Sequence, residues 1–268
     1  ITQTGALTQA PSATGVFTLT ENTASWNILL TQANNINGAI TFASGATLGN
    51  VQDFSLTNTN AAASAPTNFT SLTALRNLTL NFSNASASIN LPSITLNNGG
   101  NLSLTAGAAI SQSGTVIVPG TTTLNAGTSI DFTTNGSSNS LTGTVTLSSG
   151  TTASITNTQA LNFAASTIGS NLTAIGAGIA QSGALTVSGT SSFTAGANSI
   201  ALTQSGNSFS GAVALNNSGN NAVSLVNTTA LSLGTSSVGT GDLNITASGN
   251  ITQTGALTQA PSATGVFT

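Results

Sequence analysis

Short segments of alternating apolar and polar residues run through most of the chain, and they are clearest from Gly100 onward. In the last part of the chain these segments start in close succession, at Ser199, Ala212, Ala222, Ala230 and Asp242. Strict alternation is typical of strands with one buried face, and the Gly, Asn and Ser between segments favour turns. The pattern therefore predicts short strands at 101–106, 144–149, 171–176, 199–204, 212–217, 222–227, 230–235 and 242–247.

The preceding part of the chain, 19–99, follows the same pattern less regularly. We predict strands there too, with longer loops around 61–68. A small subdomain inserted at this point is the alternative. No segment of the chain keeps apolar residues at i, i+3, i+4 and i+7 over several turns, so the fold class is all-β. The strands predicted in this part are 25–32, 39–44, 53–58 and 77–84.

The chain repeats itself. Its opening segment 1–18, ITQTGALTQAPSATGVFT, returns unchanged at 251–268. The core of this segment also recurs as ISQSG at Ile110 and IAQSG at Ile179, so the first interval is longer than the two that follow. We interpret 1–18 as a coil that ends one repeat, 19–99 as less regular coils, 100–250 as regular coils, and 251–268 as the start of the next 250-residue repeat.

Tandem repetition distinguishes between the all-β architectures. A sandwich or a barrel gains nothing from copying itself, whereas a solenoid buries each coil on the next. The prediction is an elongated parallel β-helix, and the bias of parallel crossovers favours a right-handed one. Coils of about 20 residues would give about 12 coils and roughly 60 Å per repeat at the usual strand spacing. Coils of about 23 or 24 residues, three in each of the two shorter intervals, fit equally well.

Composition limits the function. Charged residues make up 2% of the chain and the net charge is −3, with no His, Cys, Met or Tyr. Nucleic acids and anionic membranes require clusters of Lys and Arg, so neither is an expected partner. No apolar run reaches the length of a membrane span, and we expect neither membrane insertion of this segment nor a signal peptide at Ile1. Without cysteine, no disulfide stabilises the fold.

The reactive side chains are few and far apart in sequence. The carboxylates are Glu21, Asp53, Asp131 and Asp242. A paired-carboxylate mechanism would need stacking to bring two of them together, and we interpret each as a solvated turn residue or a local turn cap. Serine lacks the usual histidine base, and no acidic cluster resembles a calcium loop. Trp26 and Arg76 are interpreted as a loop anchor and a surface cation. We therefore predict no catalytic, cofactor-binding or metal-binding residues, and no enzyme.

The ITQTGALT, ISQSGTVIV and IAQSGALTVSGTSSF segments resemble repeats of filamentous haemagglutinin-type exoproteins, large bacterial surface adhesins of two-partner secretion systems. The resemblance covers most of 100–268 and 1–18. It implies a right-handed parallel β-helix that is exported through an outer-membrane pore and displayed as a fibre. The absence of cysteine fits passage of an unfolded chain through an oxidising periplasm.

Together these observations lead to the expectation of a structural shaft. The chain would give reach and rigidity to a long tandem-repeat adhesin or fibre, extracellular and on the bacterial cell surface. Its partners would be neighbouring copies of the repeat, head to tail or side by side, and a receptor of unknown kind. The alternatives are a solenoid that binds ice through rows of Thr-x-Thr, or binds glycans, and, less favoured, a polysaccharide-active enzyme.

Overall fold

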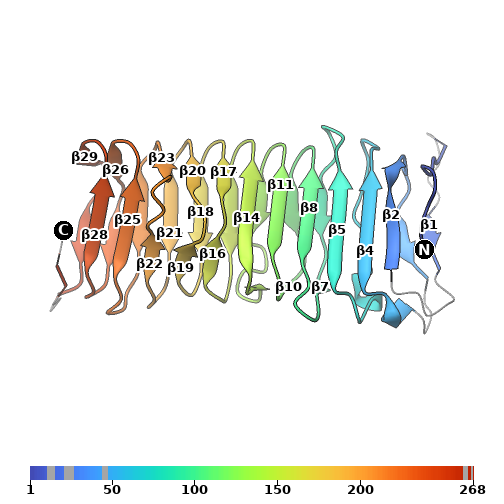
Figure 1. Cartoon of the computed structure of the whole chain (residues 1–268), viewed down its shortest axis with the longest axis horizontal. Coiled ribbons are helices and arrows are strands. Elements are labelled where there is room, and N and C mark those ends of the chain that lie inside the picture. The colour runs from blue at the N-terminus through green and yellow to red at the C-terminus, as the bar shows by residue number, and fades with distance from the viewer. Residues whose placement is uncertain (11–15, 21–26, 44–47, 262–264, 267) are drawn as a thin grey trace. The chain divides into compact units, whose positions relative to one another are not determined.

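The computed structural model describes residues 1–10, 16–20, 27–43, 48–261, 265–266 and 268. The chain forms two compact units, 1–143 and 144–268. Each unit is a parallel β-solenoid in which strands of successive turns lie side by side (Figure 1). All-β architecture and a parallel solenoid are therefore confirmed, and the described residues form no α-helix. No helix among them could cross a membrane.

Unit 1 is built on a long sheet with strand order β2-β4-β5-β8-β11. A short sheet, β6-β9-β12, a three-stranded sheet, β7-β10-β13, and the pair β1-β3 accompany it. The elements are β1 (Phe17–Leu19), β2 (Asn27–Asn34), β3 (Ile40–Phe42), η1 (Leu48–Asn50), β4 (Asp53–Asn58), η2 (Phe69–Ser71), β5 (Asn77–Phe82), β6 (Ile89–Leu91), β7 (Ile94–Thr95), β8 (Leu102–Ala106), β9 (Ile110–Gln112), β10 (Val116–Val118), β11 (Thr122–Ala126), β12 (Ile130–Phe132) and β13 (Ser140–Leu141).

Unit 2 has a first sheet, β14-β16-β19-β22-β25-β28, and a second sheet, β15-β18-β21-β24-β26-β29, each with short strands paired beside the main path. Its strands are β14 (Thr144–Ser149), β15 (Ala153–Thr156), β16 (Leu161–Phe163), β17 (Ser166–Ile168), β18 (Leu172–Ile175), β19 (Ile179–Gln181), β20 (Leu185–Val187), β21 (Ser191–Thr194), β22 (Ile200–Leu202), β23 (Ser208–Phe209), β24 (Val213–Asn216), β25 (Val223–Asn227), β26 (Leu231–Leu233), β27 (Ser236–Val238), β28 (Leu243–Ala247), β29 (Ile251–Gln253) and β30 (Leu257–Gln259).

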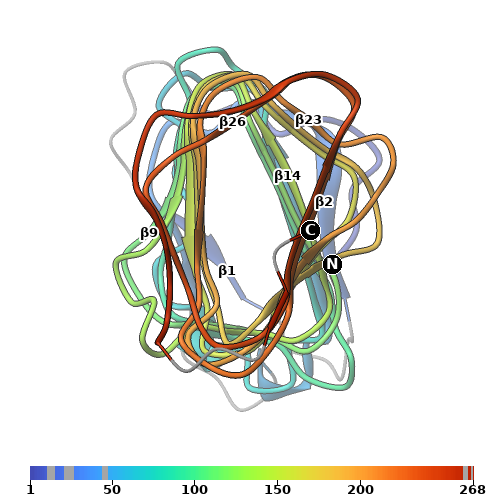
Figure 2. The ribbon, with the colours of Figure 1, turned by 90° about the vertical axis from the view of Figure 1, so that its left-hand side faces the viewer.

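Alternation along each strand fills the interior. In unit 1 the inward positions of the long sheet stack in register, as in the row of Leu56, Leu80, Leu104 and Leu124, each at most 1% exposed. Apart from Asp53, the outward positions of the same strands carry Ser, Thr and Asn. Figure 2 shows the turns closing around this interior, which the inward side chains occupy. A period of two along each strand places every second side chain in the interior of the stack.

The length of a turn varies. In unit 1, Leu102 pairs with Leu78 of the preceding turn and with Thr122 of the following one, so the second of these turns is shorter than the first. In unit 2, the turn from Leu161 to its partner Ile179 is shorter still. Turns close to both predicted coil lengths therefore occur.

The strands predicted from alternation are confirmed, except that residues 25–26 and 44 of those predictions lie outside the described residues. The additional strands have two to five residues.

Candidate functional site

The one salt bridge among the described side chains joins two consecutive turns of unit 1. Asp53 begins β4, and Arg76 precedes β5, whose Asn77 is the register partner of Asp53. The Arg76 guanidinium donates to both carboxylate oxygens, Nη2 to Oδ2 at 2.7 Å and Nε to Oδ1 at 3.2 Å. The hydrogen bond and the charge of Asp53 raise the pKa of Arg76. The Arg76 side chain is 41% exposed, so this pair is a surface contact of modest energy.

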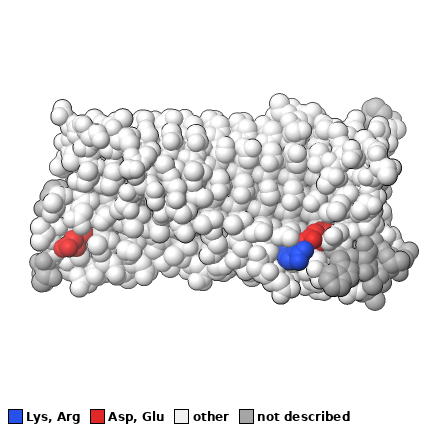
Figure 3. All heavy atoms as spheres, viewed as in Figure 1, with Lys and Arg blue, Asp and Glu red and all other residues white. Residues whose placement is uncertain are grey.

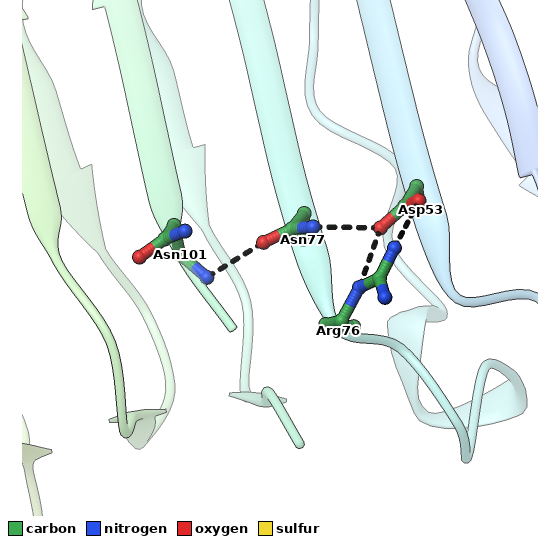
Figure 4. Close-up of polar contacts among 4 residues, drawn as sticks. All are labelled: Asp53, Arg76, Asn77 and Asn101. Atoms are coloured by element: carbon green, nitrogen blue, oxygen red, sulfur yellow. Dashed lines mark hydrogen bonds and ion pairs between the residues drawn. The ribbon is translucent and has the colours of Figure 1, made fainter. Parts of the chain in front are cut away.

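Polar side chains continue this contact along the edge of the long sheet. Asn77 Nδ2 donates to Asp53 Oδ1 at 2.7 Å, and Asn77 Oδ1 accepts from the backbone N–H of Asn101 at 2.9 Å (Figure 4). Asn101 Oδ1 in turn accepts from the N–H of Thr121 at 2.7 Å. The charges of Asp53 and Arg76 neutralise each other, and each member of the row bonds to the turn beside it. The arrangement ties consecutive turns together.

The remaining carboxylates are not brought together. In unit 1, Asp131 lies on β12 of the short sheet, whereas Asp53 lies on the long sheet, and Asp131 accepts from the N–H and hydroxyl of Thr133. In unit 2, Asp242 accepts from the N–H of Val266 at 2.8 Å. The contacts of Asp131, which lies within β12, are local as expected of a cap, whereas Asp242 and Asp53 bond to residues 24 and 23 positions away in sequence. Glu21 and Trp26 lie outside the described residues.

Surface charge is correspondingly sparse. Figure 3 shows a face with one basic group beside an acidic group and otherwise almost no charge. Among the residues whose placement is described, no three His, Cys, Asp or Glu residues lie close enough to hold a metal ion. The groups that could carry polar catalysis or metal binding are thus dispersed over the described surface.

A groove of about 370 Å³ lies on the outside of unit 1. Its walls are η2 with the residues that follow it, and the outer sides of β7 and β10, including Thr70, Thr95, Asn97 and Ile117. Ile117 is one of the few large apolar side chains that are exposed, at 36%. The lining carries hydroxyl, amide and aliphatic groups but no charge, so it offers hydrogen bonds and apolar contact without a reactive group.

The outer face of the long sheet carries a regular polar array. Four consecutive turns place Ser or Thr in one outward row and Thr or Asn in the next. The first row is Ser55, Thr79, Ser103 and Thr123, and the second is Thr57, Asn81, Thr105 and Asn125. Strand geometry sets the spacing at about 4.8 Å between turns and about 7 Å between rows. Only some of these positions belong to Thr-x-Thr segments, so sequence spacing alone did not reveal the array.

The repeated segment forms the most specific side-chain contact in the chain. In three of its four copies, the Gln of ITQTG, ISQSG or IAQSG pairs with an Asn of the next turn; we call these the Gln–Asn pairs. They are Gln3–Asn34, Gln112–Asn139 and Gln181–Asn207.

The three Gln–Asn pairs share one geometry. The Gln amide donates to the Asn side-chain oxygen at 2.8–3.0 Å, and the Asn amide donates back at 2.7–3.0 Å. The Gln also donates to the carbonyl of the Gly two residues on, at 2.7–2.8 Å. The Asn oxygen accepts a further backbone N–H, from Leu7, Val116 or Leu185. All three Asn side chains are fully buried, so each pair satisfies polar groups that water cannot reach.

The sequence prediction treated the repeated segment as a coil boundary and did not identify these contacts. Each Gln is followed by its Asn partner 26 to 31 residues later, which is one turn and a few residues more. That interval varies with loop length, so the partner is hard to find without the register. For Asn139 and Asn207, the signal that could have found the partner is an Asn directly before a short strand with a buried apolar residue.

A family model described as repeats of unknown function (DUF5649) matches the chain three times, at residues 75–148, 150–216 and 219–266. The matches cover more than half of the sequence. No curated protein and no solved structure matches it.

Proposed function

The chain belongs to the family of repeats of unknown function (DUF5649), and from this premise we propose that it is the structural shaft of a long tandem-repeat adhesin or fibre on the bacterial cell surface. The shaft gives reach and rigidity and catalyses no reaction. It lies outside the cell, contacts neighbouring copies of the repeat, and neither binds nucleic acid nor enters the membrane.

One observation carries this proposal: polar contacts between successive turns recur inside the solenoid, each time from a fresh copy of the same segment. The Gln–Asn pairs join each such turn to the next through buried amides. Beside them, the inward row of Leu56, Leu80, Leu104 and Leu124 runs through four consecutive turns. A stack held together by neighbour contacts resists bending and can be extended by adding turns.

The location is proposed from the sequence. The repeats resemble those of filamentous haemagglutinin-type exoproteins, and a chain without cysteine can be exported unfolded without forming disulfides. Polar but nearly uncharged surfaces also favour side-by-side contact between shafts, because little electrostatic repulsion separates them.

Electron microscopy of chains with one, two and three 250-residue repeats would test the shaft. We expect the contour length to grow by about 50–60 Å for each added repeat, at about 4.8 Å per turn. As a control, a chain lengthened by the same number of residues with a Gly/Ser linker should show no added length of straight rod. A length that does not increase with repeat number would contradict the proposal.

The polar array on the long sheet of unit 1 favours a second candidate, binding of ice. Its two rows run over four turns in register and present hydroxyl and amide groups at a constant spacing. Thermal hysteresis of the chain tests this candidate, with the Thr79→Tyr variant as the control that disrupts the array. If thermal hysteresis is absent, or is unchanged in the variant, the candidate is excluded.

A further inference from the structure

The corner between β7 and β8 holds an Asn–Gly step, Asn98–Gly99, in a left-handed backbone conformation. Asn98 is the one described non-glycine residue with a positive φ, at 53°, and the φ of Gly99 is 71°. The turn is closed by Gly100 N–H, which donates to Asn97 O at 3.0 Å. Two central residues with positive φ are typical of a type I′ turn, which favours Asn followed by Gly. Local sequence and backbone conformation therefore agree at this corner.

The step is open to solvent. Both of its residues are exposed, and neither the Asn98 side chain nor the Gly99 N–H forms a hydrogen bond with any described residue. A Cβ built on Gly99 would meet nothing within 4 Å. The amide nitrogen of Gly99 is therefore accessible to water, and no described group competes for the carboxamide of Asn98.

The other two Asn–Gly steps of the chain, 37–38 and 135–136, differ in both respects. In the first, the glycine N–H donates to Gln9 Oε1 at 2.7 Å, and in the second it donates to Thr133 O at 2.9 Å. Both glycines are buried, and both asparagines are half-buried. The chain thus has one Asn–Gly step with a free amide nitrogen and two in which that nitrogen is hydrogen-bonded.

We propose that Asn98 is a site of intramolecular deamidation, with water as the co-reactant. The backbone nitrogen of Gly99 gives its proton to hydroxide and attacks Cγ of Asn98. The new C–N bond closes a cyclic succinimide, and the side-chain nitrogen takes a proton from water and leaves as ammonia. Water then adds to either ring carbonyl and breaks its bond to the Gly99 nitrogen, which leaves aspartate or isoaspartate at position 98. Glycine suits the attacking position because it has no Cβ to crowd the ring.

A hydrogen bond at the attacking nitrogen slows this reaction. The amide must be released from its acceptor before it can lose its proton and approach the side chain. At 37–38 and 135–136 this release breaks one hydrogen bond and opens the turn locally, which lowers the rate about tenfold. At Asn98 no such bond has to be broken, so the fold selects one step out of three with the same chemistry.

Deamidation changes both charge and geometry at this corner. An aspartate at position 98 adds one negative charge to a chain whose net charge is −3. An isoaspartate also adds a methylene group to the backbone of a turn whose last residue, Gly100, accepts the N–H of Gly120 in the following turn at 2.9 Å. For shafts that lie side by side, the added charge supplies a repulsion that the nearly uncharged surface lacks. This last consequence alone depends on the shaft proposal.

The test incubates the full 268-residue chain in mildly alkaline buffer, folded and unfolded in concentrated urea, and follows the three steps by peptide mass spectrometry. In the folded chain Asn98 should convert about tenfold faster than Asn37 and Asn135, whereas in urea the three should convert at similar rates. The Gln9→Ala variant is the matched control. It removes the acceptor of the Gly38 N–H, so it should accelerate conversion of Asn37 and leave that of Asn98 unchanged.

Two results would overturn the proposal. One is a folded chain in which Asn98 converts no faster than the other two asparagines. The other is an excess at Asn98 that is as large in urea as in the folded chain, because the excess would then come from the neighbouring sequence. If Gln9→Ala unfolds the chain, as circular dichroism would show, the comparison between folded and unfolded unmodified chain still decides. Mass spectrometry measures the conversion whether or not shafts associate, and contour-length measurements test the shaft separately.

Discussion

Removing one buried amide should cost this solenoid as much stability as removing a core side chain. Asn207 is fully buried, and its Oδ1 accepts from Gln181 Nε2 at 2.8 Å and from Leu185 N–H at 2.9 Å. Its Nδ2 donates to Gln181 Oε1 at 2.7 Å and to Leu202 O at 3.1 Å. The Asn207→Ala substitution removes all four hydrogen bonds at once.

The expected loss of stability comes from the hydrogen-bonding groups that lose Asn207 as their partner. The Leu185 N–H faces the interior and has no water to replace Asn207, and an orphaned buried donor costs about 1–3 kcal/mol. The two bonds with Gln181 add about 1 kcal/mol net, because half-buried Gln181 regains some hydrogen bonding with water. We therefore expect Asn207→Ala to lower the free energy of unfolding by about 2–4 kcal/mol. The exposed Asn244 on β28 is the matched control, and Asn244→Ala should change it by less than about 0.5 kcal/mol.

Urea unfolding followed by circular dichroism measures the difference in the free energy of unfolding between each variant and the unmodified chain. Hydrogen exchange at the Leu185 amide shows whether the change arises at this site. Exchange at that amide should accelerate in Asn207→Ala and stay slow in Asn244→Ala. A double-mutant cycle with Gln181→Ala should give a coupling energy, because the two side chains bond directly. Equal stability of the two Asn variants, together with a Leu185 amide that stays protected, would refute the reasoning.

Three further predictions concern the core, the corners and pH. Leu104→Ala, in the fully buried row of the long sheet, should lower the free energy of unfolding by about 2–5 kcal/mol, whereas Thr105→Ala on the outer face should change it little, as urea unfolding will show. A Cβ at Gly127 would overlap the Gly107 carbonyl, so Gly127→Ala should lower the melting temperature, and Gly5→Ala, with open space around it, should not. The chain has no His, Cys, Tyr or Lys, and the raised pKa of Arg76 means that its contribution is lost only at pH values above its ordinary pKa; the melting temperature should therefore stay constant from pH 6 to 7 in calorimetry.

Much of the fold could be predicted because the alternation of apolar and polar residues carries it directly. Strands such as β8 and β25 repeat the pattern over five residues, and tandem copies exclude a sandwich. The alternation does not predict the shortest strands, such as β13 and β23, which have two residues each. Two residues cannot show a period, so only the neighbouring turn identifies them.

The side-chain contacts were harder to predict for a different reason. The Gln–Asn pairs and the row from Asp53 to Thr121 join residues that are one turn apart, and the length of a turn varies with its loops. Interpreting Arg76 as a surface cation was sound as far as exposure goes, but its partner Asp53 is 23 residues earlier. Without the register between β4 and β5, nothing in a separation of 23 residues indicates that Asp53 and Arg76 are partners.

The repeated segment occurs in both sheets of unit 2. Ile179–Gln181 belongs to the first sheet and Ile251–Gln253 to the second, so three turns and a half separate these two copies. A sequence that is accommodated on either side offers a point at which genetic recombination can lengthen or shorten the solenoid by three turns and a half at a time. Each such product would keep its apolar rows facing inward. The gene could therefore change the length of the protein without first evolving new sequence.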